Sequence, residues 1–269
     1  MERLKVDYSL IDSSSLLSYL FFPRRDYRKP PPGAFDLEVS VSEDATISCR
    51  AYASSPDDPW ILFFHGNGEV VGDYNSIASY YNRRSLNLLV ADYRGYGTST
   101  GRPTFAALLS DAHAILSKVR VELPVRGYRP HLWVMGRSLG SISALELAYH
   151  HPALLQGVIF ESGFISVVRL VNHLGLPSPG DLSSLERECR DTARGITVPA
   201  LVIHGEEDSL VPLSQGRELF EELGSAQKEL VTIPGAEHND IMSVGRDDYM
   251  AAIRKFVYET TPHTPPHLL

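Results

Sequence analysis

The chain has 269 residues, of which 43% are hydrophobic and 22% charged, so it is long enough to fold as one domain, 1–269, and is not disordered in composition. Its formal net charge of -8 and the lack of a basic stripe argue against nucleic-acid binding. The two cysteines, Cys49 and Cys189, have no Cys-x-x-Cys spacing, so we expect a reducing, cytoplasmic location.

The first feature along the chain is a short apolar patch at residues 16–22. It is too short to span a membrane and lacks the basic start of a signal peptide, so we expect it to pack on the core or on a lid. No other stretch approaches the length of a membrane span, and we expect no stable membrane insertion. A peripheral contact of this patch with a membrane is the alternative.

Alternating apolar and polar residues at 35–41 and 46–53 predict an antiparallel hairpin. After it, short apolar runs alternate with segments of helix length. This pattern predicts an α/β fold with a mostly parallel, twisted sheet and helices on both faces. The strands are expected at 60–64, 86–91, 132–135, 158–160, 200–203 and 229–233.

Several of the intervening segments have apolar residues at helical spacing. The clearest helix follows Pro103, where Thr104 can cap its first turn. Helices are expected at 104–119, 213–223 and 246–258.

An irregular insertion, 165–196, separates two of the expected strands and contains a Leu-Pro-Ser-Pro-Gly sequence. We expect it to lie over the carboxyl edge of the sheet as a small cap and to shape a substrate pocket.

The pentapeptide Gly136-Arg-Ser-Leu-Gly140 stands between the expected strand at 132–135 and a run with helical spacing. This order is typical of a nucleophile elbow, in which a strained turn presents Ser138 and the backbone N–H of Leu139 faces a developing oxyanion. The alternative is a structural turn whose serine only caps the next helix.

A serine nucleophile needs a general base and an acid that orients it. Asp208 follows the strand at 200–203, and His238 follows the last strand. Serine, acid and histidine therefore come in the chain order that a catalytic triad takes on a mostly parallel sheet. We therefore expect Asp208 to be the acid and His238 the base. Glu161, at the end of the strand at 158–160, is the competing acid.

The loop His65-Gly-Asn-Gly68 follows the strand at 60–64, and its glycines allow a carbonyl to approach the backbone. We expect the Asn67 backbone N–H to complete the oxyanion hole with that of Leu139, and the backbone N–H of Gly68 is the alternative donor. The structural alternative is a glycine turn that only reverses the direction of the chain. No histidines lie at metal-ligand spacing, so we expect no metal.

Five motifs over residues 35–258 together resemble the α/β-hydrolase superfamily, close to bacterial serine aminopeptidase-like and BEM46-like hydrolases. The resemblance implies a Ser138, Asp208 and His238 triad that acts through an acyl-enzyme without a cofactor. Ser141 stands where many relatives have a second glycine. The motifs are Phe64-His-Gly-Asn67, Asp92-Tyr-Arg-Gly-Tyr-Gly97 with Ser99, Gly136-Arg-Ser-Leu-Gly140, Gly205-Glu-Glu-Asp208 with Val211-Pro212, and Gly235-Ala-Glu-His238-Asn-Asp240.

The expected function is therefore that of a serine hydrolase acting on an ester or thioester of a small molecule. Two alternatives are a serine peptidase for short peptides and a binding protein that keeps the fold without catalysis. A peptidase would need acids in the cap to hold a substrate ammonium group, but arginines between these acids favour a solvated helix face. The acids are Asp181, Glu186, Glu188 and Asp191.

Overall fold

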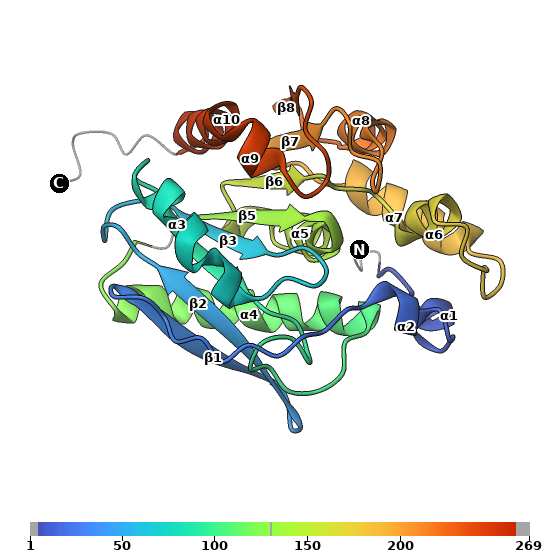
Figure 1. Ribbon diagram of the computed structural model, residues 1–269, viewed down its shortest axis with the longest axis horizontal. Coiled ribbons are helices and arrows are strands. Elements are labelled where there is room, and N and C mark those ends of the chain that lie inside the picture. Colours follow the sequence, from blue (N-terminus) through green and yellow to red (C-terminus); the bar gives the residue numbers. More distant parts are fainter. Residues whose placement is uncertain (1–4, 130, 262–269) are drawn as a thin grey trace.

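The computed structural model describes residues 5–129 and 131–261, which form an eight-stranded sheet in the order β1-β2-β4-β3-β5-β6-β7-β8 (Figure 1). β1 pairs with β2 and β2 with β4 in antiparallel orientation, and all other pairs are parallel. The predicted hairpin and mostly parallel sheet are confirmed. The strands are β1 Ala34–Ser42, β2 Ala45–Tyr52, β3 Trp60–Phe64, β4 Asn87–Ala91, β5 Leu132–Arg137, β6 Gly157–Glu161, β7 Ala200–Gly205 and β8 Lys228–Ile233.

Helices cover both faces of the sheet, as predicted. Helices α4 and α5 lie on one face, and α3, α9 and α10 lie on the other (Figure 1). Side chains of each group join the core on their own face. The α-helices are α1 Ser9–Asp12, α2 Leu17–Leu20, α3 Tyr74–Asn82, α4 Phe105–Val125, α5 Ser141–His150, α6 Val167–His173, α7 Ser183–Arg194, α8 Leu213–Glu222, α9 Ile241–Val244 and α10 Arg246–Glu259. Short 3₁₀ turns lie at Val71–Asp73, Ser138–Gly140 and Pro152–Leu154.

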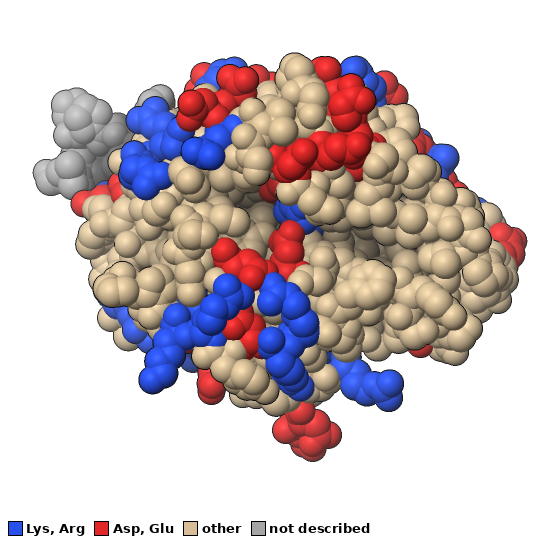
Figure 2. Space-filling model, viewed as in Figure 1, with Lys and Arg blue, Asp and Glu red and all other residues tan. Residues whose placement is uncertain are grey.

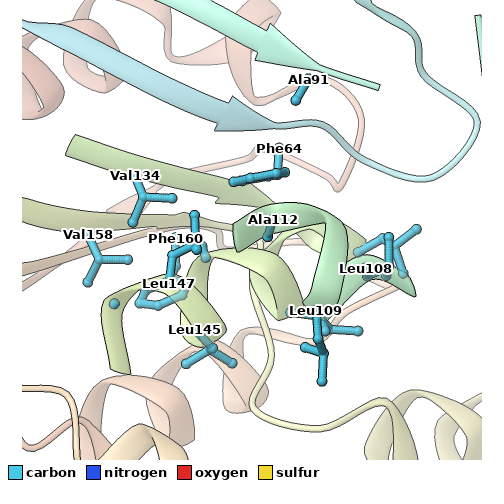
Figure 3. Close-up of a cluster of buried hydrophobic side chains, with 14 of the residues drawn as sticks. Phe64, Ala91, Leu108, Leu109, Ala112, Val134, Leu145, Leu147, Val158 and Phe160 are labelled. Atoms are coloured by element: carbon cyan, nitrogen blue, oxygen red, sulfur yellow. The ribbon is translucent and has the colours of Figure 1, made fainter. Parts of the chain in front are cut away.

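The central parallel strands are mostly apolar because both of their faces are buried, whereas the edge strand β8 contains polar residues and is only partly buried. Along β5, Val134 joins the core under α4 and α5, whereas Trp133 and Met135 join the core on the opposite face. Figure 3 shows the first of these cores, where Val134 and Phe160 from the strands meet helix side chains. Packing on both faces holds these strands in position. Because they are parallel, their carboxyl ends lie at the same edge of the sheet.

Helix α4 begins where the sequence predicts, because the Thr104 side chain accepts a hydrogen bond from the backbone N–H of Ala107 at 3.0 Å. The Asp12 carboxylate also accepts from the backbone N–H groups of Phe105 and Ala106, at 2.8 and 2.9 Å. The helix extends past the predicted end, since Leu123 is still fully buried. The amino-terminal segment is thus fastened to the start of α4.

The insertion 165–196 contains two helices that lie in different places. Helix α6 lies at the carboxyl edge of the sheet (Figure 1), where its residues line one cavity together with residues of α2. Helix α7 packs against α5 and α8. In the part of the chain that the structure describes, no helix has the length and apolarity needed to cross a membrane.

Candidate active site

Ser138 occupies a strained turn directly after β5. Its φ is +51°, in the left-handed region that a residue with a side chain rarely adopts. The following turn passes close to β3, and a Cβ atom on Gly140 would collide with the carbonyl oxygen of Phe64. Gly140 therefore lets the turn approach the sheet closely. Ser138 lies at the carboxyl edge of the sheet.

The structure brings Ser138, His238 and Asp208 into one hydrogen-bonded row. Ser138 Oγ lies 3.1 Å from His238 Nε2, and His238 Nδ1 lies 2.8 Å from Asp208 Oδ2. All three residues are buried. With Nδ1–H donating to the carboxylate, Nε2 is free to accept the serine proton.

Asp208 is held as a carboxylate by several donors. Burial by itself would raise its pKa, but hydrogen bonds from His204 and His238 outweigh this, and the pKa of Asp208 lies well below its ordinary value. Its Oδ1 atom also accepts from the backbone N–H groups of Leu210 and Val211, at 3.1 and 2.8 Å. The charge needed to stabilise a protonated imidazole is therefore present.

The loops that carry Asp208 and His238 lie close together because of Gly205, at the end of β7. A Cβ atom there would collide with the carbonyl oxygen of Ala236. The backbone N–H of Glu207 donates to the same carbonyl at 3.0 Å. These contacts hold the two loops together next to the hydrogen-bonded residues Ser138, His238 and Asp208.

Glu161, the competing acid, has other partners. Its carboxylate is 3.1 Å from Arg137 Nε and accepts from the Tyr249 hydroxyl at 2.8 Å. Burial raises its pKa, against the opposing effects of Arg137 and the Tyr249 hydroxyl. Its hydrogen bonds do not include His238, so the geometry favours Asp208.

Arg137 is a residue of the site that the sequence analysis did not single out. Its Nη2 atom donates to the His238 carbonyl oxygen at 2.7 Å and to Asn239 Oδ1 at 3.0 Å. Nη1 forms an ion pair with Glu69. The available signal was its position: in an extended strand, the residue before the nucleophile points to the opposite face.

The charged residues Glu69, Arg137 and Glu161 line a cavity of about 160 Å³ between α3, α9 and α10. Figure 2 shows this face, which is hollowed near its centre and has acidic and basic side chains around the hollow. Burial by itself would lower the pKa of Arg137, but the negative charges of Glu69 and Glu161 raise it by a larger amount. The net shift is upward, so the guanidinium stays charged.

The loop after β3 is fixed by side chains. The Asn67 side chain accepts from the backbone N–H of Phe22 at 2.9 Å and from the Tyr96 hydroxyl at 2.6 Å, and it donates to the Leu20 carbonyl at 3.1 Å. The nitrogens of the His65 ring lie 2.8 Å from the Gly66 carbonyl oxygen and 3.1 Å from the carboxylate of Asp92. The backbone here is therefore held in place.

A cavity of about 90 Å³ opens beside Ser138, and both expected oxyanion residues, Asn67 and Leu139, line it. The rest of its wall is hydrophobic or aromatic and comes from the amino-terminal segment, α6, the start of α4 and the loop after β7. The acids of the cap lie elsewhere. Glu186 pairs with Arg169 and Arg190, Asp191 with Arg194, Glu188 accepts from the backbone of Asp7, and Asp181 accepts from that of Ser183.

No metal site is evident over residues 5–129 and 131–261, where no three His, Cys, Asp or Glu side chains are arranged to hold an ion.

A protein-family model described as "Serine aminopeptidase, S33" matches residues 55–180 and 179–242. Among curated proteins, the chain is 31% identical to Protein bem46 of Schizosaccharomyces pombe over 252 residues, covering 88% of this chain and 82% of that one. It is 30% identical to the human alpha/beta hydrolase domain-containing protein 17B over 224 residues, covering 81% and 73%.

Solved structures share the fold at lower identity. The Pyrococcus furiosus esterase Pf2001 is 18% identical, with a TM-score of 0.74 over 90% of this chain and 98% of that one. Est1E from Butyrivibrio proteoclasticus, in a structure with bound ferulic acid, is also 18% identical, with a TM-score of 0.68 over 83% and 98%.

Proposed function

Since this chain belongs to the α/β-hydrolase superfamily, in the family described as serine aminopeptidase S33, we propose that it is a serine hydrolase that cleaves an ester or thioester of a small substrate. The observation that carries the proposal is the row of hydrogen bonds from Ser138 through His238 to Asp208. A hydroxyl within reach of an oriented imidazole can be deprotonated as it attacks.

In the first half of the reaction, His238 Nε2 takes the Ser138 proton while Oγ bonds to the substrate carbonyl carbon. The carbonyl π electrons move to oxygen, and the backbone N–H groups of Asn67 and Leu139 stabilise the oxyanion. Asp208 stabilises the imidazolium. When the carbonyl re-forms, the bond to the leaving oxygen or sulfur breaks, the leaving group takes the proton from His238, and an acyl-enzyme remains.

In the second half, His238 accepts a proton from water as the water oxygen attacks the acyl carbon. The bond to Ser138 Oγ then breaks, Oγ regains a proton from His238, and the acid is released. Both halves use the same base and oxyanion donors, and no other reactant is needed.

The cavity favours an ester or thioester over a peptide. Its hydrophobic wall offers no charged side chain to a substrate ammonium group, and the acids of the cap are engaged in ion pairs or backbone hydrogen bonds outside it. Of the two solved structures compared above, one is named an esterase and the other holds a carboxylic acid, ferulic acid, which supports the same class of reaction.

A fluorophosphonate probe tests the proposal, because it reacts only with an activated serine. We expect the wild-type protein to be labelled and the Ser138→Ala variant to be unlabelled. Hydrolysis of 4-nitrophenyl esters, acyl-CoA thioesters and aminoacyl amides is then compared. Absence of labelling together with absence of hydrolysis would indicate the binding protein instead, and a preference for aminoacyl amides would indicate the peptidase.

We also propose that the protein works in a reducing compartment such as the cytoplasm. Cys49 and Cys189 are both buried as free thiols. Burial raises the pKa of each thiol, which keeps both unreactive.

A further inference from the structure

The amino-terminal strap, which we define as residues 17–22, reaches the candidate site from a distant part of the sequence. It lies outside residues 55–242, the part that the family model matches. Even so, Tyr19, Leu20 and Phe22 line the cavity beside Ser138. Figure 1 shows α2 of the strap and α6 at the same end of the sheet, where the strands reach their carboxyl ends. The cavity thus lies between the strap and α6.

The strap is fastened to the loop after β3. The Asn67 side chain binds the strap on either side of Phe21, at the Leu20 carbonyl and at the Phe22 N–H. Phe21 itself is buried, and its ring lies 5.0 Å from that of Phe105. A wall held by backbone hydrogen bonds and a buried aromatic anchor has a defined shape, so it can discriminate among substrates.

The size and chemistry of the cavity define what fits. Besides Ser138 and Asn67, its wall is formed by hydrophobic and aromatic residues such as Leu20, Leu170 and Val211. A cavity of about 150 Å³ holds the six carbons of benzene, so the space beside Ser138 accommodates about three to four carbons. The group bound there is therefore uncharged, aliphatic and short.

The cavity lies on the acyl side of the reacting carbonyl. Asn67 and Leu139, the expected oxyanion donors, line it, whereas His238 lies outside its wall. The leaving group has to lie beside His238 Nε2, which protonates it, while the acyl group stays bonded to Ser138. The part of the substrate that enters the cavity is therefore the acyl group.

On the basis of the proposed function, we propose that the amino-terminal strap is the specificity-determining wall of an acyl pocket that selects short, uncharged aliphatic acyl groups. Tyr19, Leu20 and Phe22 limit the length of the acyl chain that fits into the pocket. The strap thereby supplies a recognition element that the family-matched part of the chain does not contain.

The test compares kcat/KM for 4-nitrophenyl acetate, butyrate, hexanoate and octanoate. For the wild-type protein we expect the highest value with butyrate. Leu20→Ala enlarges the pocket, and we expect the hexanoate-to-butyrate ratio to rise about tenfold, since a methylene in an apolar pocket changes discrimination by that order. Leu20 is buried, so Tyr19→Ala and Phe22→Ala, at exposed positions, give the same test with less effect on folding.

Tyr27→Ala is the matched control for Tyr19→Ala. Both tyrosines are exposed, 75% and 61% respectively, and only Tyr19 lines the cavity. The control should keep the wild-type chain-length profile. A second ester series varies the alcohol at constant butyrate. An unchanged acyl profile in all three strap variants, or a shift that follows the alcohol instead, would overturn the proposal.

Binding separates this proposal from the hydrolytic one. Calorimetry measures the affinity of the Ser138→Ala protein for the same intact esters, with and without Leu20→Ala or Tyr19→Ala. If the wild-type protein hydrolyses none of them, the proposed function fails, but a strap-dependent shift in chain-length affinity still supports the pocket. Equal affinities with and without the strap substitutions reject it.

Discussion

Arg137 and His238 are joined across the edge of the sheet by a hydrogen bond of 2.7 Å from the guanidinium to the His238 carbonyl oxygen. The residue before the serine thus holds the loop that carries the proposed base. Arg137 is itself fixed between Glu69 and Glu161. The distance between Ser138 and His238 therefore depends on an ion cluster on the opposite face of the sheet, in which Arg137 and Glu161 are buried and Glu69 is partly buried.

Replacing Arg137 should impair turnover through the position of His238. We expect Arg137→Met to lower kcat about 100-fold, because a misplacement of about 1 Å costs that much, with a smaller change in KM. Arg137→Lys should recover part of the loss. Unpaired Glu69 and Glu161 should also reduce the free energy of unfolding by about 3–5 kcal/mol in Arg137→Met, which urea denaturation measures.

Arg94→Met is the control for this substitution, because Arg94 forms its ion pair with Asp111 of α4 and not with the His238 loop. It should keep kcat near the wild-type value. Normal kcat in folded Arg137→Met would show that the cluster does not position the base.

Ser138 links activity to backbone strain. Its φ of +51° is costly for serine or alanine but not for glycine. Both Ser138→Ala and Ser138→Gly should abolish hydrolysis and remove the same hydrogen bond to His238. Ser138→Gly should nevertheless be the more stable variant by about 1 kcal/mol, as measured by thermal denaturation. Equal melting temperatures would mean that the turn stores no strain.

Asp208 and Glu161 are distinguished by a pair of isosteric substitutions. We expect Asp208→Asn to lower kcat about 10⁴-fold, because the amide leaves His238 in the wrong tautomer. Glu161→Gln should lower it much less, since Glu161 acts on Arg137 and Tyr249. Steady-state kinetics at neutral pH measure both. The reverse order of effects would assign Glu161 as the acid.

The pH dependence of stability should also report on Asp208. Its pKa is lowered in the folded protein, so the unfolded chain binds the proton first as the pH falls. The stabilising contribution is therefore complete above the ordinary pKa of 3.8 and is lost as the pH falls below it. Urea denaturation between about pH 2 and pH 5 should give a steeper decline for wild type than for Asp208→Asn. Parallel curves would contradict the lowered pKa.

The central parallel strands could be predicted because they are apolar on both faces, and β3 matches the apolar run at 60–64 residue for residue. Ser138, Asp208 and His238 could be found because each follows a parallel strand, and parallel strands end at one edge. These inferences use local patterns and chain order alone.

The packing of residues 16–22 on the rest of the molecule was predicted, but the role of Arg137 and the place of the strap beside Ser138 could not be, because both depend on long-range contacts. Arg137 meets a carbonyl 101 residues later in the chain, and Asn67 meets the backbone of Leu20, 47 residues earlier. The motif around Asn67 predicts a role for its backbone N–H only. Its side chain also binds the strap, and no motif indicates such a contact.

The dual position of Asn67 leads to a last prediction. Asn67→Ala keeps the backbone N–H but removes the hydrogen bonds to Leu20, Phe22 and the Tyr96 hydroxyl. If the side chain holds both the strap and the oxyanion loop, kcat for 4-nitrophenyl butyrate should fall about 10- to 100-fold, and trypsin should cut faster after Arg24 and Arg25. The exposed Asn172 provides the matched control, since Asn172→Ala should change neither quantity. Faster cleavage with unchanged kcat would mean that the strap and the oxyanion loop are independent, because the strap would then loosen while the donor stayed in place.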